Sequence, residues 1–267
     1  MLLAIDVGNT NVTFALFEGD QIEASFRLMT KQPRTSDEYG MTILSLLKGN
    51  HLKKRDISDI IYCSVVPKIN YALCSALIKY LRIRPVQVTY RCDTGITLKA
   101  DSPEQVGADR IVDAAAAYEI YGGPVIVIDY GTATTYDLVT KDGTFAGAVT
   151  APGVQTSASA LWSAAAKLPE VEIRKPKTIL AQNTVTSMQA GIYYGQIGQT
   201  EAIIKQIKKE SGCRNAKVIA TGGLGQMIKD GTDLIDIYDK DLTMHGLRII
   251  YERECRNGIS DAHRISK

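Results

Sequence analysis

The stretch Ala4-Ile5-Asp6-Val7-Gly8-Asn9-Thr10 returns in the second half of the chain as Val127-Ile128-Asp129-Tyr130-Gly131-Thr132-Ala133. In both stretches apolar residues lead to an aspartate, and a glycine follows two positions later. A predicted strand and a turn of glycine and aspartate come next in each case, and close to half of the 267-residue chain separates the two aspartates. Two copies are too few for a solenoid, so the repeat predicts two domains of like topology.

Hydrophobic periodicity and turn residues around the repeat predict an α/β fold. In the first half we expect strands at 2–6, 11–17, 21–28, 57–66 and 85–89, and helices at 35–47 and 69–81. In the second half we expect strands at 125–129, 133–139, 144–149 and 217–220, and helices at 184–209 and 241–254. We place the domain boundary after residue 118, which gives domains 1–118 and 119–267. The polar tail from Arg256 is expected to be mobile.

The composition is that of an ordinary globular protein. Hydrophobic residues make up 45% and charged residues 22%, which excludes a disordered chain. The net charge of +2 gives no argument for a nucleic-acid partner. No apolar stretch approaches a membrane span, and the N-terminus lacks the basic start of a signal peptide, so we expect a cytoplasmic protein. The five cysteines are widely spaced without a C-x-x-C, which argues against disulfides and zinc.

The first copy of the repeat has the residues of a phosphate-binding turn. Asp6 ends a buried strand, and the small or amide residues from Gly8 to Asn11 leave backbone N–H groups open to phosphate oxygens. Asp6 can hold Mg²⁺, which prefers few carboxylates. The alternative is a plain hairpin turn in which Gly8 and Asn9 supply positive φ angles. The second copy favours the phosphate interpretation, because ordinary turns need no repeated aspartate.

The second copy places Asp129 at an equivalent strand end and Thr132 in the turn. The Thr132 hydroxyl can bind a phosphate, or it can bond to its own backbone as in many turns. A third glycine-rich turn, Thr221-Gly222-Gly223, follows a strand and lets backbone approach an adenine or a phosphate. The chain contains no P-loop motif, which excludes that class of kinase.

A further motif, Gly107-Ala108-Asp109-Arg110, combines a glycine with an acid and a base. Asp109 can accept a hydroxyl proton, and Arg110 can clamp a carboxylate. Ser102-Pro103-Glu104-Gln105 has the form of a capping box, so a helix starts near Pro103 and includes Gly107, or it starts at Asp109. The alternative for the motif is a surface ion pair with Asp109 as an N-cap.

Together these motifs resemble the superfamily of acetate and sugar kinases, heat-shock chaperones and actin and, within it, the type III pantothenate kinase family. Further matching residues are Ala151-Pro152-Gly153, Asn183-Thr184-Val185 and Thr221-Gly222-Gly223, in family order over nearly the whole chain. The resemblance implies two ribonuclease-H-like (actin-like ATPase) domains related by internal duplication, with a nucleotide cleft between them. It also implies a homodimer.

The resemblance implies ATP-dependent phosphorylation of pantothenate to 4′-phosphopantothenate, the first step of coenzyme A biosynthesis, with Mg²⁺ and a monovalent cation, K⁺ or NH₄⁺. It assigns ATP binding to Asp6, Val7, Gly8, Asn9, Thr10, Asn11, Val12, Thr13 and Thr132. It assigns pantothenate binding to Gly107, Ala108, Asp109, Arg110 and Thr184, with Asp109 as general base. Asp129 would hold the monovalent cation and Asp6 the Mg²⁺. The alternative for Thr184 is the N-cap of a long helix.

The chain departs from the family at Ala100, where an aromatic residue is frequent, and at Ser102, where asparagine is common. Ala100 supports a related kinase that acts on another small alcohol. Two competing classes are a regulatory homologue without turnover and a filament-forming, actin-like ATPase. Four intact residues argue against the regulator: Asp6, Asp109, Arg110 and Asp129. The short chain without large insertions argues against the filament former.

Three glycines, Gly191, Gly195 and Gly198, share one face of the predicted helix 184–209. Each glycine costs about 1 kcal/mol inside a helix, so we expect something to pack very close to them. Either a second copy of the chain supplies it, or another element of the same chain does.

Overall fold

The computed structural model describes residues 1–256, so the predicted mobility beyond Arg256 concerns residues outside this range. The chain forms two compact units. The first unit combines Met1–Thr97, Asp101–Ala116 and the segment from Leu242, and the second combines Leu98–Ala100 with Ala117–Asp241. The predicted boundary assigned the C-terminal helix to the second domain, which is wrong, because this helix packs on the strands Leu2–Val7 and Asp59–Ser64 of the first unit.

The first unit is built on a five-stranded sheet in the order β3-β2-β1-β4-β5. Its strands are β1 (Leu2–Val7), β2 (Asn11–Glu18), β3 (Gln21–Met29), β4 (Asp59–Ser64) and β5 (Val86–Gln87). β1 pairs antiparallel with β2 and parallel with β4. The central strand β1 therefore lies between a hairpin partner and a crossover strand.

The second sheet repeats this order. It consists of β7 (Val125–Tyr130), β8 (Ala133–Val139), β9 (Thr144–Pro152), β10 (Lys217–Thr221) and β11 (Ile237–Tyr238), arranged β11-β10-β7-β8-β9 with β6 (Thr97–Leu98) added at the β9 edge. β7 pairs antiparallel with β8 and parallel with β10. Apart from β6, each strand thus has its counterpart in the first sheet, which confirms the predicted fold class with an internal duplication.

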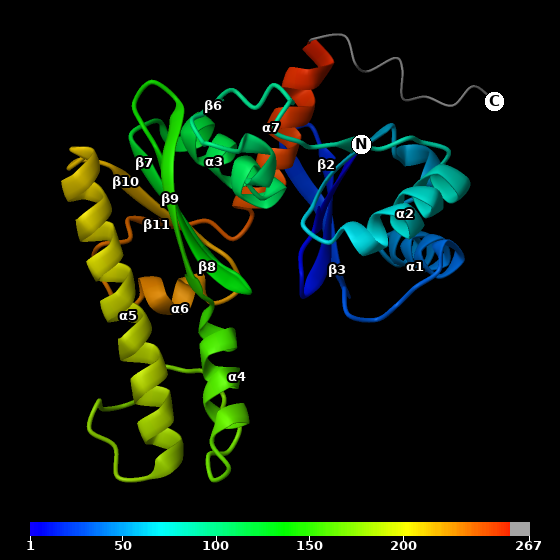
Figure 1. Cartoon of the computed structure of the whole chain (residues 1–267). Coiled ribbons are helices and arrows are strands. Elements are labelled where there is room, and N and C mark those ends of the chain that lie inside the picture. The colour runs from blue at the N-terminus through cyan, green and yellow to red at the C-terminus, as the bar shows by residue number, and fades with distance from the viewer. Residues whose placement is uncertain (257–267) are drawn as a thin grey trace. The chain divides into compact units, whose positions relative to one another are not determined.

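Helices cover both faces of the first sheet (Figure 1). They are α1 (Ser36–Gly49), α2 (Pro67–Ala76), α3 (Ala108–Tyr121) and α7 (Leu242–Arg256). Side chains alternate along β1, so Leu3, Ile5 and Val7 pack with α1 and α2, whereas Leu2 and Ala4 pack with α3 and α7. Asp6 lies on the same face of β1 as Leu2 and Ala4, so its side chain is directed toward α3 and α7.

The second unit carries α4 (Val154–Ala164), α5 (Thr184–Ser211) and α6 (Gly225–Lys229). The predicted helix 184–209 is confirmed as α5, which buries Tyr193, Ile197 and Ile204 against the sheet. α4 was not predicted; it lies beside the N-terminal part of α5 (Figure 1). None of the helices within residues 1–256 combines the length and apolar character needed to cross a membrane.

The segment before the Gly107 motif folds differently from its capping-box pattern. The Ser102 side chain caps nothing, and only a short 3₁₀ turn forms at Pro103–Gln105. α3 begins at Ala108, so Gly107 stays outside the helix and avoids the cost of a helical glycine. The second predicted start, at Asp109, is therefore closer to the observed one.

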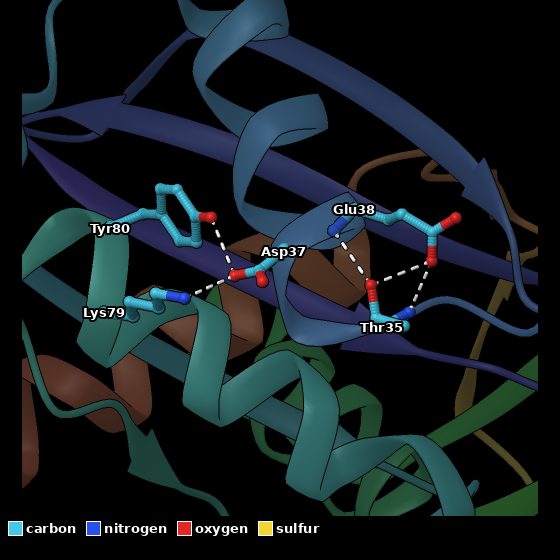
Figure 2. Close-up of polar contacts among 5 residues, drawn as sticks. All are labelled: Thr35, Asp37, Glu38, Lys79 and Tyr80. Atoms are coloured by element: carbon cyan, nitrogen blue, oxygen red, sulfur yellow. Dashed lines mark hydrogen bonds and ion pairs between the residues drawn. The ribbon is translucent and has the colours of Figure 1, made fainter.

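A true capping box starts α1 (Figure 2). The Thr35 hydroxyl accepts from the Glu38 N–H at 3.3 Å, and the Glu38 carboxylate accepts from the Thr35 N–H at 2.7 Å. Asp37, in the same first turn of α1, accepts hydrogen bonds from the Lys79 ammonium and the Tyr80 hydroxyl, both at 2.7 Å. These contacts tie the start of α1 to the segment that follows α2.

Replacing the capping threonine tests this account. Thr35→Ala should lower the free energy of unfolding by about 1 kcal/mol, because the first turn of α1 loses its side-chain acceptor. Thr35→Ser keeps the hydroxyl and should unfold at nearly the wild-type urea concentration. Equal urea midpoints for the alanine variant and the wild-type protein would contradict the cap.

Candidate active site

Asp6 stands where β1 ends and two strands flank it. It lies opposite Thr13 of β2 and beside Cys63 of β4 in the sheet register. The Cys63 thiol donates to Asp6 Oδ1 at 3.4 Å. Cys63 is fully buried, and burial together with the nearby carboxylates raises its pKa well above the ordinary value. The sulfur therefore keeps its proton and serves as the donor.

Asp109 lies on the first turn of α3, on the same side of the sheet as Asp6. Its Oδ1 accepts from the Arg110 N–H at 2.8 Å. A Cβ added to Gly107 would lie 2.5 Å from that same oxygen. Because Gly107 has no side chain, the Asp109 carboxylate can occupy this space. Asp109 is half-buried and lies inside α3, so the interpretation of Asp109 as the N-cap of that helix is wrong.

The two carboxylates affect each other electrostatically. Burial, and then the charge of Asp109, raise the pKa of Asp6 to about 7, although the Cys63 hydrogen bond opposes the shift. Burial also raises the pKa of Asp109, and the backbone and charge of Arg110 oppose this. Two acids that resist ionisation side by side favour a bound cation or a shared proton.

The turn after Asp6 joins β1 to β2. The Gly8 N–H donates to the Asn11 carbonyl oxygen at 3.0 Å, and the Asn9 and Thr10 side chains are exposed. Neither Gly8 nor Asn9 has a positive φ angle, so the expectation that they supply this conformation is wrong. The side chains of Val7 and Val12 are buried in the core, and only their backbone can contribute to a site.

The second strand-end aspartate is enclosed by glycines. Asp129 ends β7, and a Cβ added to Gly222 would lie 2.4 Å from its Oδ1. A Cβ added to Gly131 would lie 3.0 Å from Oδ2. Gly222 also has a φ of +87°, which side chains rarely adopt. The Thr221-Gly222-Gly223 turn therefore packs on the Asp129 carboxylate.

Thr132 lies exposed in the turn between β7 and β8. Its carbonyl oxygen accepts from the Gly153 N–H at 3.1 Å and from the Thr156 hydroxyl at 2.7 Å. The first turn of α4 thus holds this turn. The sequence does not reveal Thr156, because no motif marks it and the helix that carries it was not predicted.

An open groove of about 680 Å³ lies between α4 and α5. Its lining is mainly apolar: Val154, Ser157, Leu161, Leu168, Thr184, Ser187, Met188, Gly191, Ile192, Gly195, Gln196 and Gln199. The N-cap of α5 is Asn183, whose side chain accepts from the Thr186 N–H at 3.0 Å. The N-cap interpretation of Thr184 is therefore wrong; Thr184 is exposed and lines the groove.

The three glycines of α5 face open space. A Cβ added to Gly191, Gly195 or Gly198 would meet no atom within 4 Å among the described residues. Packing against another element of the same chain, one of the two predicted explanations, is therefore wrong within residues 1–256.

The donor groups suit a magnesium ion with few protein ligands. Within residues 1–256 no three histidine, cysteine or acidic side chains gather as a metal site. Asp6 and Asp109 instead offer two interacting carboxylates beside a turn. Mg²⁺ commonly binds through one or two carboxylates, waters and substrate phosphates, so these residues fit it.

Comparisons with known proteins agree with the fold. A putative 2-dehydro-3-deoxygalactonokinase from Sinorhizobium meliloti superposes with a TM-score of 0.59 at 12% sequence identity, covering 100% of this chain and 98% of that one. This likeness shows the two-domain fold of sugar kinases and actin-like ATPases.

The sequence comparisons identify the family. A family model described as type III pantothenate kinase matches residues 2–206. A type III pantothenate kinase from Agathobacter rectalis is 58% identical over 259 residues, which cover 97% of this chain and 100% of the relative. Another from Bifidobacterium longum subsp. infantis is 46% identical over 256 residues, covering 96% and 100%. The resemblance predicted from the motifs is confirmed, and the chain belongs to the type III pantothenate kinase family.

Proposed function

We propose that this chain transfers the γ-phosphoryl group of ATP to pantothenate and forms 4′-phosphopantothenate, the first step of coenzyme A biosynthesis. The family match supports the activity, and the pair of Asp6 and Asp109 beside the β1–β2 turn is the observation that carries the assignment to residues. Phosphoryl transfer needs positioning and charge neutralisation more than covalent chemistry; this site can position the reactants, and its two carboxylates can hold the cation that neutralises charge. Because ATP and pantothenate are small cytoplasmic metabolites, we place the enzyme in the cytoplasm.

Asp109 acts as the general base. Its half-buried carboxylate has a raised pKa, which makes it a better proton acceptor than a solvated aspartate. It takes the proton from the primary hydroxyl of pantothenate as that oxygen attacks the γ-phosphorus, and the bond from this phosphorus to the β–γ bridging oxygen breaks, so that ADP leaves. Arg110 binds the pantothenate carboxylate, for which its planar guanidinium is suited. Gly107 and Ala108 line the same site, and Thr184 contacts the substrate.

Asp6 and the β1–β2 turn bind the phosphates of ATP. The residues from Val7 to Thr13 form the phosphate-binding segment, in which the N–H groups left open by the strand pairing and by the Gly8–Asn11 bond meet the phosphate oxygens, and Asp6 holds Mg²⁺ directly or through water. The ion supplies positive charge that neutralises the phosphates and the two neighbouring carboxylates. Cys63 keeps the Asp6 carboxylate oriented through its hydrogen bond.

Asp129 binds a monovalent cation, K⁺ or NH₄⁺, and Thr132 contacts ATP. The glycines around Asp129 support this assignment. Because they have no side chains, the backbone can lie close to the Asp129 carboxylate. In a kinase without a P-loop lysine, such a cation adds positive charge near the phosphates.

The enzyme works as a homodimer built on α5. The open space over Gly191, Gly195 and Gly198 and the apolar groove beside them support a second copy at this face. Ile179 and Leu180, just before α5, are 60% and 84% exposed, which is unusual for large apolar side chains in a monomer. Because Thr184 lines the groove, the partner lies next to a substrate-contacting residue.

A second candidate is a related kinase for another small alcohol. The small side chain of Ala100 favours it, because a pocket wall there lacks the aromatic ring that is frequent in the family. An assay that compares pantothenate with other small alcohols separates the two candidates. A protein that binds ATP but phosphorylates none of them would be a regulator.

Asp109→Asn should lower kcat by roughly 10²- to 10⁴-fold, because a positioned proton acceptor is lost. Affinity for an ATP analogue, measured by calorimetry, should stay near the wild-type value. Glu104→Gln removes an exposed carboxylate from the same segment and is the matched control. Near-wild-type turnover in Asp109→Asn would refute the assignment.

Turnover should require K⁺ or NH₄⁺ and should be lost in Na⁺ alone at equal ionic strength. The reason is that the Asp129 site must hold a cation to neutralise the negative charge of the ATP phosphates. Initial rates in the three chloride salts measure this, and Asp129→Asn should abolish the difference between salts. Equal rates of the wild-type enzyme in all three salts would rule out the cation site.

Gly195→Leu should give monomers with a raised pantothenate KM, because the leucine fills the space that a second α5 occupies. Sedimentation at micromolar concentration measures the oligomeric state. Gly49→Leu adds the same side chain at an exposed, open position of α1 and should remain dimeric. A dimeric Gly195→Leu protein, or a monomeric wild type, would disprove the proposed interface.

A further inference from the structure

The β1–β2 turn is held from outside by one residue that no motif marks. Thr30 follows β3 directly, and its hydroxyl donates to the Gly8 carbonyl oxygen at 2.7 Å. Its backbone N–H donates to the Thr10 carbonyl oxygen at 2.9 Å. A single residue therefore binds two carbonyl groups of the turn, one on each side of Asn9.

These two bonds fix which way the peptide groups point. In a trans peptide the carbonyl and the following N–H point in opposite directions. Since the Gly8 and Thr10 carbonyls are directed at Thr30, the N–H groups of Asn9 and Asn11 are directed away from it. A turn that binds phosphate needs its N–H groups on one side and its carbonyl oxygens, which repel phosphate, on the other.

The side chain of Thr30 is well placed for this role. Thr30 is only 7% exposed, so its hydroxyl bond competes little with water. The main-chain bond to Thr10 extends the β2–β3 ladder by one pair beyond Asn11 and Met29. Any residue except proline can make that main-chain bond, whereas the Gly8 bond requires a hydroxyl.

The second hairpin is also held by a threonine hydroxyl and a backbone N–H, but these come from two residues and meet at one carbonyl group. In the turn between β7 and β8, the Thr132 carbonyl oxygen accepts from the Thr156 hydroxyl, also at 2.7 Å, and from a main-chain N–H, that of Gly153. Thr156, like Thr30, comes after the third strand of its sheet. Two turns at equivalent places in the duplicated topology are thus each held by a threonine hydroxyl and a backbone N–H.

We propose that Thr30 is a positioning residue for ATP binding: its hydroxyl holds the Gly8 peptide so that the β1–β2 turn presents N–H groups to the phosphates. This inference rests on the proposed function, because it assumes that the turn binds ATP. Thr30 itself touches no substrate in this scheme and acts through Gly8 and Thr10.

Thr30→Val removes the hydroxyl and keeps the shape and the backbone N–H. Affinity for a non-hydrolysable ATP analogue, measured by calorimetry, should fall roughly five- to twentyfold. The KM for ATP should rise by a similar factor, whereas the KM for pantothenate stays unchanged. Thr30→Ser should restore the affinity, because it restores the donor.

A matched control separates positioning from general stability. Thr94 is a buried threonine of the same unit whose hydroxyl donates to the Ile96 carbonyl oxygen. It lies beside Asp93, which contacts the C-terminal turn of α7 through Arg253 and Glu254. Thr94→Val should keep the wild-type affinity for the analogue.

Amide hydrogen exchange of the unliganded protein tests the turn itself. In Thr30→Val the amides of residues 8–11 should exchange faster than in the wild type and in Thr30→Ser. Unchanged analogue affinity and unchanged exchange in Thr30→Val, or an equal loss in Thr94→Val, would overturn the inference. A wild-type protein that did not bind the analogue would instead refute the proposed function, and the exchange measurement would still decide whether Thr30 holds the turn.

Discussion

The proximity of two half-buried carboxylates, Asp6 and Asp109, is the constraint on which the rest of the first unit depends. Burial raises both pKa values, and the charge of Asp109 adds to the shift of Asp6, so this buried pair is unfavourable unless positive charge arrives. The sheet register, the Cys63 thiol and the missing side chain at Gly107 all serve to keep them in place. A site that is electrostatically unfavourable when empty favours a ligand that brings a cation with it.

The duplicated topology places a second acid at the same point of the second sheet, but its surroundings differ. Asp6 is neighboured by a thiol and another acid, whereas Asp129 is surrounded by glycine backbone. The same strand-end position thus provides two environments. The surroundings of Asp6 suit a divalent cation bound with phosphates, and those of Asp129 suit a monovalent cation enclosed by the main chain.

The sequence predicted the parts of the fold that depend on period and repetition. Both hairpins, the long helix α5 and the two-domain α/β class were anticipated, because alternation and the repeated aspartate are visible in the residues. α4 was missed, since Val154–Ala164 is rich in alanine and serine, which give no clear helical period of large apolar residues. The capping box predicted at Ser102 was wrong, because the Ser102 side chain caps nothing and the backbone becomes extended at Val106 after a turn of three residues.

The site could be predicted only as far as its motifs reach. Asp6, Gly107 and Asp109 carry a local pattern, whereas Thr30 and Cys63 act through partners distant in sequence. No local rule links Thr30 to Gly8, because the bond exists only once β3 has paired with β2. Likewise the packing of Gly222 on Asp129 follows from the parallel pairing of β10 with β7.

The return of α7 to the first unit has a consequence for how the chain folds during synthesis. Met244, Leu247 and Ile250 cover the sheet face formed by Leu2 and Ala4. A ribosome must therefore make the whole second unit before the first can bury that face. At about 5–20 residues per second, this interval lasts on the order of ten seconds. Throughout it the nascent N-terminal sheet exposes an apolar surface, which makes the order of synthesis a source of aggregation risk.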